Sequence, residues 1–182
     1  MKKTIFFITL FILIFGLLSA EKTLKTQKMM NFKLQDLSGK TYELNKMLGK
    51  GPIIIDFWAT WCEPCLKELP DLSKLQTKYE DKLTVIAISV DKARKLNQVK
   101  REVKSHRYKF ITLFDKNGAY QKKLNIRNIP QTYLLDKNGN IVYHHEGFDK
   151  NATKLLENAL IKLISIDTKT SKKKINNDIN HK

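Results

Sequence analysis

The pattern of apolar positions predicts a central unit of two strands with a helix between them. Residues 53–58 (IIIDFW) and 83–90 (LTVIAISV) are apolar runs rich in β-branched side chains. Runs of this kind are typical of strands that are buried on both faces, as in a parallel sheet. Between the two runs, leucines recur at near-helical spacing and predict a helix, at Leu66, Leu69, Leu72 and Leu75. We therefore expect a parallel strand, helix and strand at the centre of the fold.

The segments around this unit predict the other elements of a mixed sheet. Residues 31–51 alternate like a β-hairpin that turns at Ser38-Gly39, and they end in a short helical turn. The further expected elements are a basic helix, a strand, a short helix, two antiparallel strands joined by a tight turn and an amphipathic helix, at 92–107, 110–114, 119–124, 131–136, 141–148 and 155–164. The expected fold class is α/β, with a mixed central sheet flanked by helices.

The two ends of the chain differ from this central part. Residues 1–20 have the charged start, short apolar run and small-residue end of a secretory leader, which predicts an exported protein. Cleavage after Ala20 is favoured over retention as an N-terminal membrane anchor. Residues 21–30 are expected to form a polar tether, 31–165 the folded domain, and 166–182 a basic, disordered tail. The expected location is the periplasm or the outer face of the cytoplasmic membrane.

Composition sets limits on the partners. The 182 residues include 34 Lys and Arg against 18 Asp and Glu, a formal net charge of +16. Such a charge favours anionic surfaces. However, the lysines are interspersed with acidic residues, and the sequence contains no nucleic-acid-binding motif. We therefore expect no nucleic-acid partner. In the basic helix at 92–107, the Lys and Arg side chains form either a partner-binding face or, as we favour, a solvated face.

The candidate chemistry lies where the first central strand turns into its helix. The chain has two cysteines, Cys62 and Cys65, and both fall near this helix N-terminus. Unpaired N–H groups and the helix dipole stabilise a thiolate there, so Cys62 is expected to be acidic, exposed and nucleophilic. At i and i+3 the sulfurs share one helix face and can close a disulfide. Pro64 suits the first turn, where its missing N–H costs little.

A zinc site is the main alternative for a C-x-x-C pair. The sequence has no second C-x-x-C or H-x-x-x-H pair at zinc spacing, which disfavours this interpretation. His144 and His145 are adjacent residues of an expected strand. Such residues point to opposite faces, so the two cannot both bind one ion. We therefore expect no metal and no cofactor other than a redox-active disulfide.

The sequence around the cysteines resembles that of a known family. DFWATWCEPC at 56–65, followed by Pro70 and much later by IPQT at 129–132, resembles the thioredoxin-fold thiol:disulfide oxidoreductases. The longer string FWATWCEPCLKELP is most similar to the TlpA/ResA-like branch of extracytoplasmic bacterial proteins, and the similarity runs from about residue 32 to residue 164. This resemblance implies a thioredoxin fold with an N-terminal β-hairpin addition and an inserted helix.

The resemblance also implies roles for particular residues. A cis bond between Ile129 and Pro130 would bring Pro130 against the disulfide and leave the backbone of Ile129 free to pair with an extended substrate. The expected substrate-binding residues are Trp61, Glu63, Pro64, Ile129 and Pro130. The expected catalytic residues are Cys62, Cys65, Glu68 and Asp56.

The resolving cysteine, Cys65, needs a base, and two carboxylates are candidates. Asp56 lies inside an apolar strand and matches the buried acid of thioredoxins, and burial is expected to raise its pKa. Glu68 lies one turn beyond Cys65 and matches the acid of ResA-like proteins, although a surface acid in the first turns of a helix is an alternative. Because the chain carries both acids, the sequence leaves the working base open.

These features predict an exported thiol:disulfide oxidoreductase. Cys62 would attack a partner disulfide and Cys65 would resolve the mixed disulfide. We expect a reductase acting on protein disulfides such as those of apocytochrome c and served by a membrane thiol donor, because the charge of Glu63 disfavours the Cys62 thiolate. The alternatives are a disulfide-forming oxidase and a thiol-based copper or metal chaperone. Peroxidase chemistry is disfavoured, since the sequence before Cys62 lacks the Thr-x-x-Cys setting of a peroxidatic cysteine.

Overall fold

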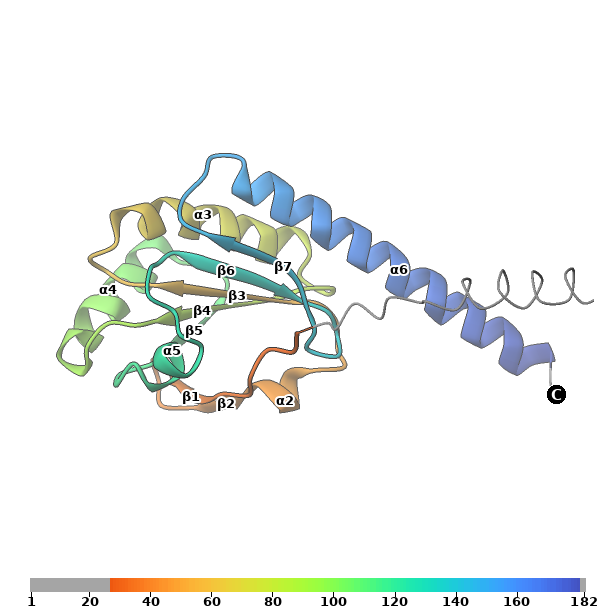
Figure 1. Ribbon diagram of the computed structural model, residues 1–182, viewed down its shortest axis with the longest axis horizontal. Helices are drawn as coiled ribbons and strands as arrows, with labels where there is room; N and C mark the ends of the chain where they lie inside the picture. Colours follow the sequence, from red (N-terminus) through yellow and green to blue (C-terminus); the bar gives the residue numbers. More distant parts are fainter. Residues whose placement is uncertain (1–26, 181–182) are drawn as a thin grey trace, which may run out of the picture.

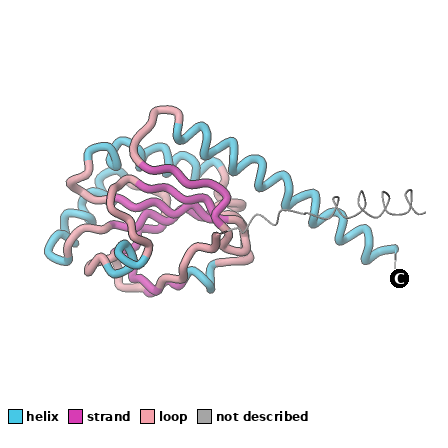
Figure 2. Tube along the Cα trace, in the orientation of Figure 1, coloured by secondary structure: helices cyan, strands magenta, loops and turns pink. Residues whose placement is uncertain are grey.

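The computed structural model describes residues 27–180, which form a seven-stranded mixed sheet with helices on both faces (Figure 1, Figure 2). The strand order is β2-β1-β5-β4-β3-β6-β7. In chain order the elements are β1 (Lys33–Asp36), β2 (Thr41–Glu43), α2 (Leu44–Met47), β3 (Ile53–Trp58), α3 (Glu63–Lys78), β4 (Thr84–Ser89), η1 (Ala93–Lys95), α4 (Leu96–His106), β5 (Ile111–Phe114), α5 (Ala119–Lys123), β6 (Gln131–Leu135), β7 (Ile141–Glu146) and α6 (Ala152–Asn180).

The two apolar runs of the sequence are central strands, as predicted. β3 and β4 pair in parallel from Ile53 opposite Thr84 to Trp58 opposite Ser89. On its other side β3 pairs antiparallel with β6, and β7 completes this edge of the sheet. The fold class predicted from the sequence is therefore confirmed.

Two hydrophobic clusters fill the space between the sheet and its helices. Alternate residues of β3 belong to different clusters, because successive side chains of a strand point to opposite faces. Ile54 and Trp58 pack in the cluster that includes α3, α4 and α6, whereas Ile55 and Phe57 pack in the cluster with α2 and α5. Asp56 shares the face of Ile54 and Trp58, so this carboxyl lies under α3.

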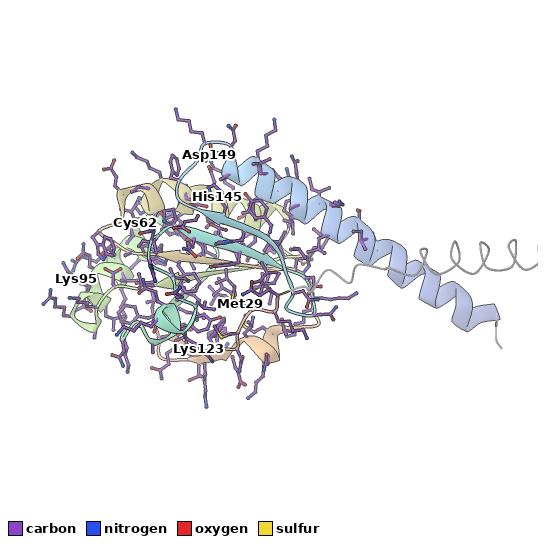
Figure 3. The ribbon with its side chains drawn as sticks, viewed as in Figure 1. Met29, Cys62, Lys95, Lys123, His145 and Asp149 are labelled. Carbon is purple, nitrogen blue, oxygen red and sulfur yellow. A yellow bond between two sulfur atoms is a disulfide. The ribbon has the colours of Figure 1, made fainter. Side chains whose placement is uncertain are left out.

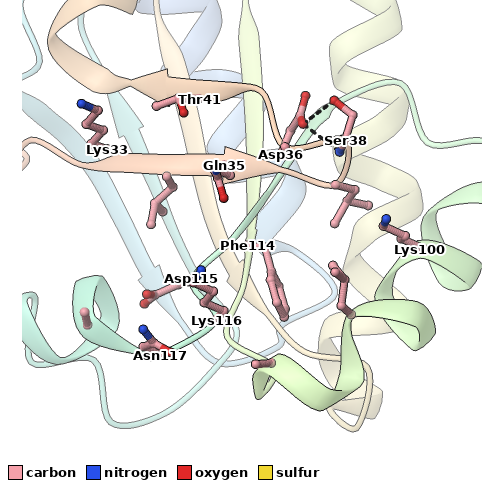
Figure 4. Close-up of a pocket in the computed structure, with 16 residues that line it drawn as sticks. Lys33, Gln35, Asp36, Ser38, Thr41, Lys100, Phe114, Asp115, Lys116 and Asn117 are labelled. Atoms are coloured by element: carbon pink, nitrogen blue, oxygen red, sulfur yellow. Dashed lines mark hydrogen bonds between the residues drawn. The ribbon is translucent and has the colours of Figure 1, made fainter.

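The predicted N-terminal hairpin is present and extends the sheet. β1 and β2 pair antiparallel, and β1 also pairs with β5. In the hairpin turn, one carboxylate oxygen of Asp36 accepts hydrogen bonds from the backbone N–H and the hydroxyl of Ser38 (Figure 4). The same oxygen accepts a hydrogen bond from the backbone N–H of Lys40. A cavity of about 680 Å³ lies between this hairpin, the segment after β5 and the first turns of α4.

The prediction of a polar tether at 21–30 is wrong for the last residues of this segment. The side chain of Met29 is buried against the face with α2 and α5, and its backbone N–H donates to the carbonyl oxygen of Gly139. Lys28 forms a β-bridge with Asn140. The apolar side chain of Met29 draws this segment into the core. Residues 21–26 and the predicted leader at 1–20 lie outside the described residues.

The terminal helix is longer than the sequence pattern predicted. We expected a helix at 155–164 and a disordered tail at 166–182, but α6 continues to Asn180. The side chains of Ala152, Leu156 and Leu160 in its first turns are buried, and the rest of the helix extends beyond the sheet (Figure 1). No Gly or Pro follows Gly147 in the sequence, so no residue that breaks a helix interrupts it. Among residues 27–180, no helix is long and apolar enough to cross a membrane.

Candidate active site

The two cysteines form a disulfide where β3 ends and α3 begins (Figure 3). Their Cα atoms are 5.3 Å apart. Cys62 is the N-cap of α3, and its sulfur accepts a hydrogen bond from the backbone N–H of Cys65 at 3.2 Å. A thiolate at Cys62 would accept the same bond more strongly, because bonds to a charged acceptor are stronger than neutral ones. The helix N-terminus therefore stabilises negative charge on the first sulfur.

The two sulfurs differ in access to solvent, but less than predicted. The expectation that Cys62 is exposed is wrong for the disulfide state, in which this residue is only 5% exposed. Both cysteines pack in the same hydrophobic cluster, against which the side chain of Ile129 also lies. Cys65 has no exposed surface, so Cys62 is still the sulfur that a partner reaches first. Beside it, Trp61 is 68% exposed and offers a large aromatic contact surface.

The loop before β6 supplies the second side of the site. The bond between Ile129 and Pro130 is cis, as the resemblance implied. The carbonyl oxygen of Ile129 lies 3.9 Å from the sulfur of Cys62, a contact and not a hydrogen bond, since a disulfide sulfur carries no proton. Ile129 makes no backbone hydrogen bond to another residue within 27–180, whereas the carbonyl oxygen of Pro130 accepts from the N–H of Gly147. The backbone of Ile129 is therefore available to a bound peptide.

Asp91 holds the turn between β3 and the disulfide in place, and no functional role was predicted for this residue. Its buried carboxylate accepts from the backbone N–H of Thr60 at 2.9 Å and from the Thr60 hydroxyl at 2.8 Å. Ser89 also donates to it, at 3.0 Å. The one available signal was an acid directly after a buried strand, at the sheet edge where active-site loops meet.

Asp56 and Glu68, which the sequence offered as alternative bases, meet at one hydroxyl. The hydroxyl oxygen of Thr132, on β6, lies 3.0 Å from Asp56 Oδ1 and 2.9 Å from Glu68 Oε1. Asp56 is 0% exposed and Glu68 is 4% exposed, so Glu68 is not a surface acid. The second oxygen of each carboxyl, Oδ2 and Oε2, is buried without a hydrogen-bond partner in the described part of the chain.

Burial controls the electrostatics of these acids. It raises the pKa of Asp56 well above the usual value, and the nearby charge of Glu68 raises it further. Burial also raises the pKa of Glu68, while the hydrogen bond from Thr132 and the electrostatic interaction with His145 oppose this rise. The expected elevation of the Asp56 pKa is therefore supported, and it extends to Glu68.

His145 belongs to the same cluster, although no role other than a disfavoured metal site was considered for it from the sequence. It lies on β7 directly opposite Thr132, which in turn lies opposite Asp56, so the three residues form a row across three strands. His145 lies on β7 (Figure 3) and is half-buried, and its Nε2 atom has no hydrogen-bond partner among residues 27–180. Only the register of β6 and β7 shows this proximity.

A comparison with known protein families shows to which family the chain belongs. A model described as the AhpC/TSA family matches residues 26–144. The chain belongs to the AhpC/TSA family. Within this family it departs from the Thr-x-x-Cys setting of a peroxidatic cysteine, because Ala59 stands three residues before Cys62.

Named relatives place the chain in the thioredoxin-like part of the AhpC/TSA family. Thiol-disulfide oxidoreductase ResA from Bacillus thuringiensis subsp. konkukian is 37% identical over 118 residues, which cover 64% of this chain and 66% of the relative, just under two thirds. Thioredoxin-like protein YneN from Bacillus subtilis is 38% identical over 122 residues, which cover 66% of this chain and 71% of YneN. The chain is a ResA-like member of the thioredoxin superfamily.

Solved structures confirm the thioredoxin fold for this AhpC/TSA family member. A protein described as thiol:disulfide interchange protein DsbE, from Chlorobium tepidum, matches with a TM-score of 0.70 and 26% identity, over 77% of this chain and 97% of that one. The pneumococcal exposed lipoprotein thioredoxin Etrx1, from Streptococcus pneumoniae, matches with a TM-score of 0.59 and 27% identity, over 70% of this chain and 97% of that one.

The first turn of α3 carries the two other predicted binding residues, Glu63 and Pro64. Pro64 occupies the first turn of the helix, as expected. The side chain of Glu63 is 80% exposed and forms an ion pair with Lys67 at 2.8 Å. This hydrogen-bonded pair lowers the pKa of Glu63, so that the side chain is ionised at neutral pH. Lys67 offsets part of the negative charge beside Cys62.

Proposed function

We propose that the protein is an exported thiol:disulfide oxidoreductase that reduces protein disulfides, such as those of apocytochrome c. The observation that carries this proposal is the Cys62–Cys65 disulfide at the N-terminus of α3, with Cys62 the more accessible sulfur. Relatives and structural neighbours named as thiol-disulfide oxidoreductases and disulfide interchange proteins support it. The disulfide is the product of the reductase reaction and the reactant of the oxidase reaction.

The proposed reaction transfers two electrons in two exchange steps. The thiolate of reduced Cys62 attacks one sulfur of the substrate disulfide, which forms a mixed disulfide and releases the first substrate thiolate. Cys65 then loses its proton to the buried acids and attacks the sulfur of Cys62. This step closes the Cys62–Cys65 disulfide and releases the second substrate thiolate. The substrate has gained two electrons, and the enzyme has lost them.

The substrate is held, in this proposal, by the surfaces on either side of Cys62. The backbone of Ile129 pairs with an extended segment of the substrate beside Pro130, because its N–H and carbonyl groups are not used by the sheet. Trp61 supplies an exposed aromatic contact, and the first turn of α3 with Glu63 and Pro64 borders it. Backbone pairing would let the enzyme accept disulfides in different sequences.

The direction of electron flow follows from the charges near the sulfurs. Glu63 is ionised and lies between the two cysteines, in the first turn of α3. Negative charge disfavours a thiolate, so it stabilises the disulfide relative to the dithiol and makes the dithiol a stronger reductant. A membrane thiol donor would then return electrons to the pair. The oxidase alternative requires a strongly stabilised thiolate.

Export rests on the leader at residues 1–20, which lies outside the described residues. The description of the pneumococcal neighbour as an exposed lipoprotein supports an extracytoplasmic location. In this proposal the leader is removed after Ala20 or retained as a membrane anchor.

The function is tested by disulfide reduction with purified protein. We expect turnover of insulin disulfides with dithiothreitol as electron source. Cys62→Ser should abolish this turnover, while Cys65→Ser should accumulate mixed disulfides that mass spectrometry detects on Cys62. Mixed disulfides on Cys65 in the Cys62→Ser protein, with none on Cys62 in the other variant, would reverse the assignment. No turnover by the unaltered protein would refute the enzymatic proposal.

A further inference from the structure

One hydroxyl faces two carboxyls in the buried cluster, and this arrangement requires at least one proton on the two carboxyls. The Thr132 oxygen is within hydrogen-bond distance of both Asp56 Oδ1 and Glu68 Oε1, at 3.0 and 2.9 Å. A threonine hydroxyl has one proton and can donate only one hydrogen bond. With both acids ionised, one of these contacts would bring lone pairs together in a buried site, which is costly. Both contacts are hydrogen bonds only when at least one carboxyl is protonated and donates to Thr132.

We propose that Asp56 and Glu68 hold a single proton between them near neutral pH, and that Thr132 is the positioning residue that passes this proton from one carboxyl to the other. The two candidate bases are then one unit. The proposal applies to thiol–disulfide exchange in either direction, so it does not depend on whether the enzyme acts as a reductase.

The surroundings decide which carboxyl holds the proton at rest. Asp56, on β3, is fully buried and faces the charge of Glu68. Burial raises the pKa of Glu68, on α3, while its electrostatic interaction with His145 on β7 lowers this pKa and its interaction with Asp71 on α3 raises it. Burial raises the pKa of Tyr143 on β7, and the nearby acids Glu68 and Asp149 raise it further. Because Asp56 is the more deeply buried of the two, the proposal places the resting proton on Asp56 and the charge on Glu68.

With this placement of the proton, the hydrogen bonds run in one direction, from Asp56 through Thr132 to Glu68. The Asp56 carboxyl donates to the Thr132 oxygen, and the Thr132 hydroxyl donates to the Glu68 carboxylate. If Asp56 gives its proton to Thr132 while Thr132 gives its own to Glu68, this direction reverses. One O–H bond breaks and one forms at each step, with no net gain of protons. A carboxylate is thus available on the strand or on the helix to accept the proton of Cys65.

The hydroxyl should separate the two titration steps of the pair. Relative to the doubly ionised pair, the singly protonated pair gains the bond from the carboxyl to Thr132. Relative to the doubly protonated pair, it keeps a stronger bond from Thr132 to a charged carboxylate. Thr132 therefore widens the pH range in which one proton is held. Coupled acids titrate in two such macroscopic steps, which belong to the pair.

The test is a pH titration of the oxidised full-length protein, followed by NMR of the Asp56 and Glu68 carboxyl carbons. We expect two separated steps, with one proton held between them at neutral pH. Thr132→Val should narrow the separation by about one pH unit, the scale of one hydrogen bond. Thr132→Ser should restore it, which a purely structural role of the side chain would not require.

Two results would overturn the proposal. One is an unchanged separation in Thr132→Val, and the other is a parent protein in which both carboxyls are ionised, or both protonated, at neutral pH. If Thr132→Val does not fold, Asp56→Asn provides the second test. In that variant Glu68 should titrate in a single, shifted step, and an unshifted Glu68 would equally refute the pair. Because the oxidised protein is titrated without substrate, failure here is distinct from failure to reduce insulin.

Discussion

The two faces of strand β3 differ in what they bury. Toward α2 and α5, Ile53, Ile55 and Phe57 form an entirely apolar surface. Toward α3, Asp56 stands between Ile54 and Trp58, and its carboxyl is as deeply buried as they are. A buried carboxyl costs stability unless it is fully paired, and one of its oxygens has no partner in the described residues. The first face therefore stabilises the fold, while the buried carboxyl on the second face costs stability.

The largest expected effect comes from the apolar face. Phe57 is fully buried and its ring lies near those of Tyr120 and Tyr133, with centroids 5.9 and 6.2 Å away. Phe57→Ala should lower the free energy of unfolding by about 3–5 kcal/mol, because it leaves a cavity. Denaturant unfolding measures this loss. Ile55→Val is the matched control on the same face and should cost about 0.5–1.5 kcal/mol. A Phe57→Ala loss no larger than that of the control would contradict the structural role of this face.

A substitution on the polar face should instead raise the free energy of unfolding at high pH. Burial raises the pKa of Asp56 in the folded protein above its ordinary value of 3.8. Below pH 3.8 the carboxyl is protonated in both the folded and the unfolded state, and its contribution to the free energy of unfolding is fully present. This contribution is lost as the pH rises through the raised pKa. Asp56→Asn should match the parent near pH 4 and exceed it at pH 9, by at least about 1 kcal/mol, the value of one pKa unit.

Unfolding curves for Asp56→Asn and the parent at both pH values provide the measurement. The same variant should slow the release of mixed disulfides, since one member of the acid pair is gone. A stability difference that is constant with pH, or that grows as the pH falls, would show that Asp56 is ionised without penalty.

Several features of the fold could be predicted from the sequence alone. The apolar runs of β3 and β4 and the C-x-x-C pair predicted the central strands and the position of the disulfide, because these features are local. The cis bond before Pro130 needed the family resemblance. The length of α6 was underestimated because the polarity of the segment suggested disorder, although no residue there interrupts a helix.

The acid cluster was only partly predictable. Asp56 and Glu68 were each identifiable, one as a charge inside an apolar strand and the other by helical spacing from Cys65. Their meeting point was not, because Thr132 is 76 residues from Asp56 and 64 from Glu68 in the chain. His145 joins them only through the register of β7 on β6. The burial of Cys62 likewise depends on packing around the disulfide, including Ile129, which is 67 residues away.

The smallest expected effect concerns the exposed charge between the cysteines. Glu63→Gln removes an anion near the Cys62 thiolate and should raise the reduction potential by about 5–20 mV, the scale of an exposed charge at a helix N-terminus. Lys67→Gln is the matched control and should shift the potential in the opposite direction, because Lys67 offsets Glu63. Both shifts should shrink at high salt. A lower potential in Glu63→Gln would contradict the proposed effect of this charge.

The reduction potential of the Cys62–Cys65 pair tests the reductase proposal most directly. It is obtained by equilibrating the purified protein with glutathione or dithiothreitol buffers and measuring the oxidised fraction by alkylation. We predict a value well below about −180 mV and closer to the value of about −270 mV that is typical of reducing thioredoxins. A potential above about −180 mV would contradict the reductase proposal and favour an enzyme that forms disulfides.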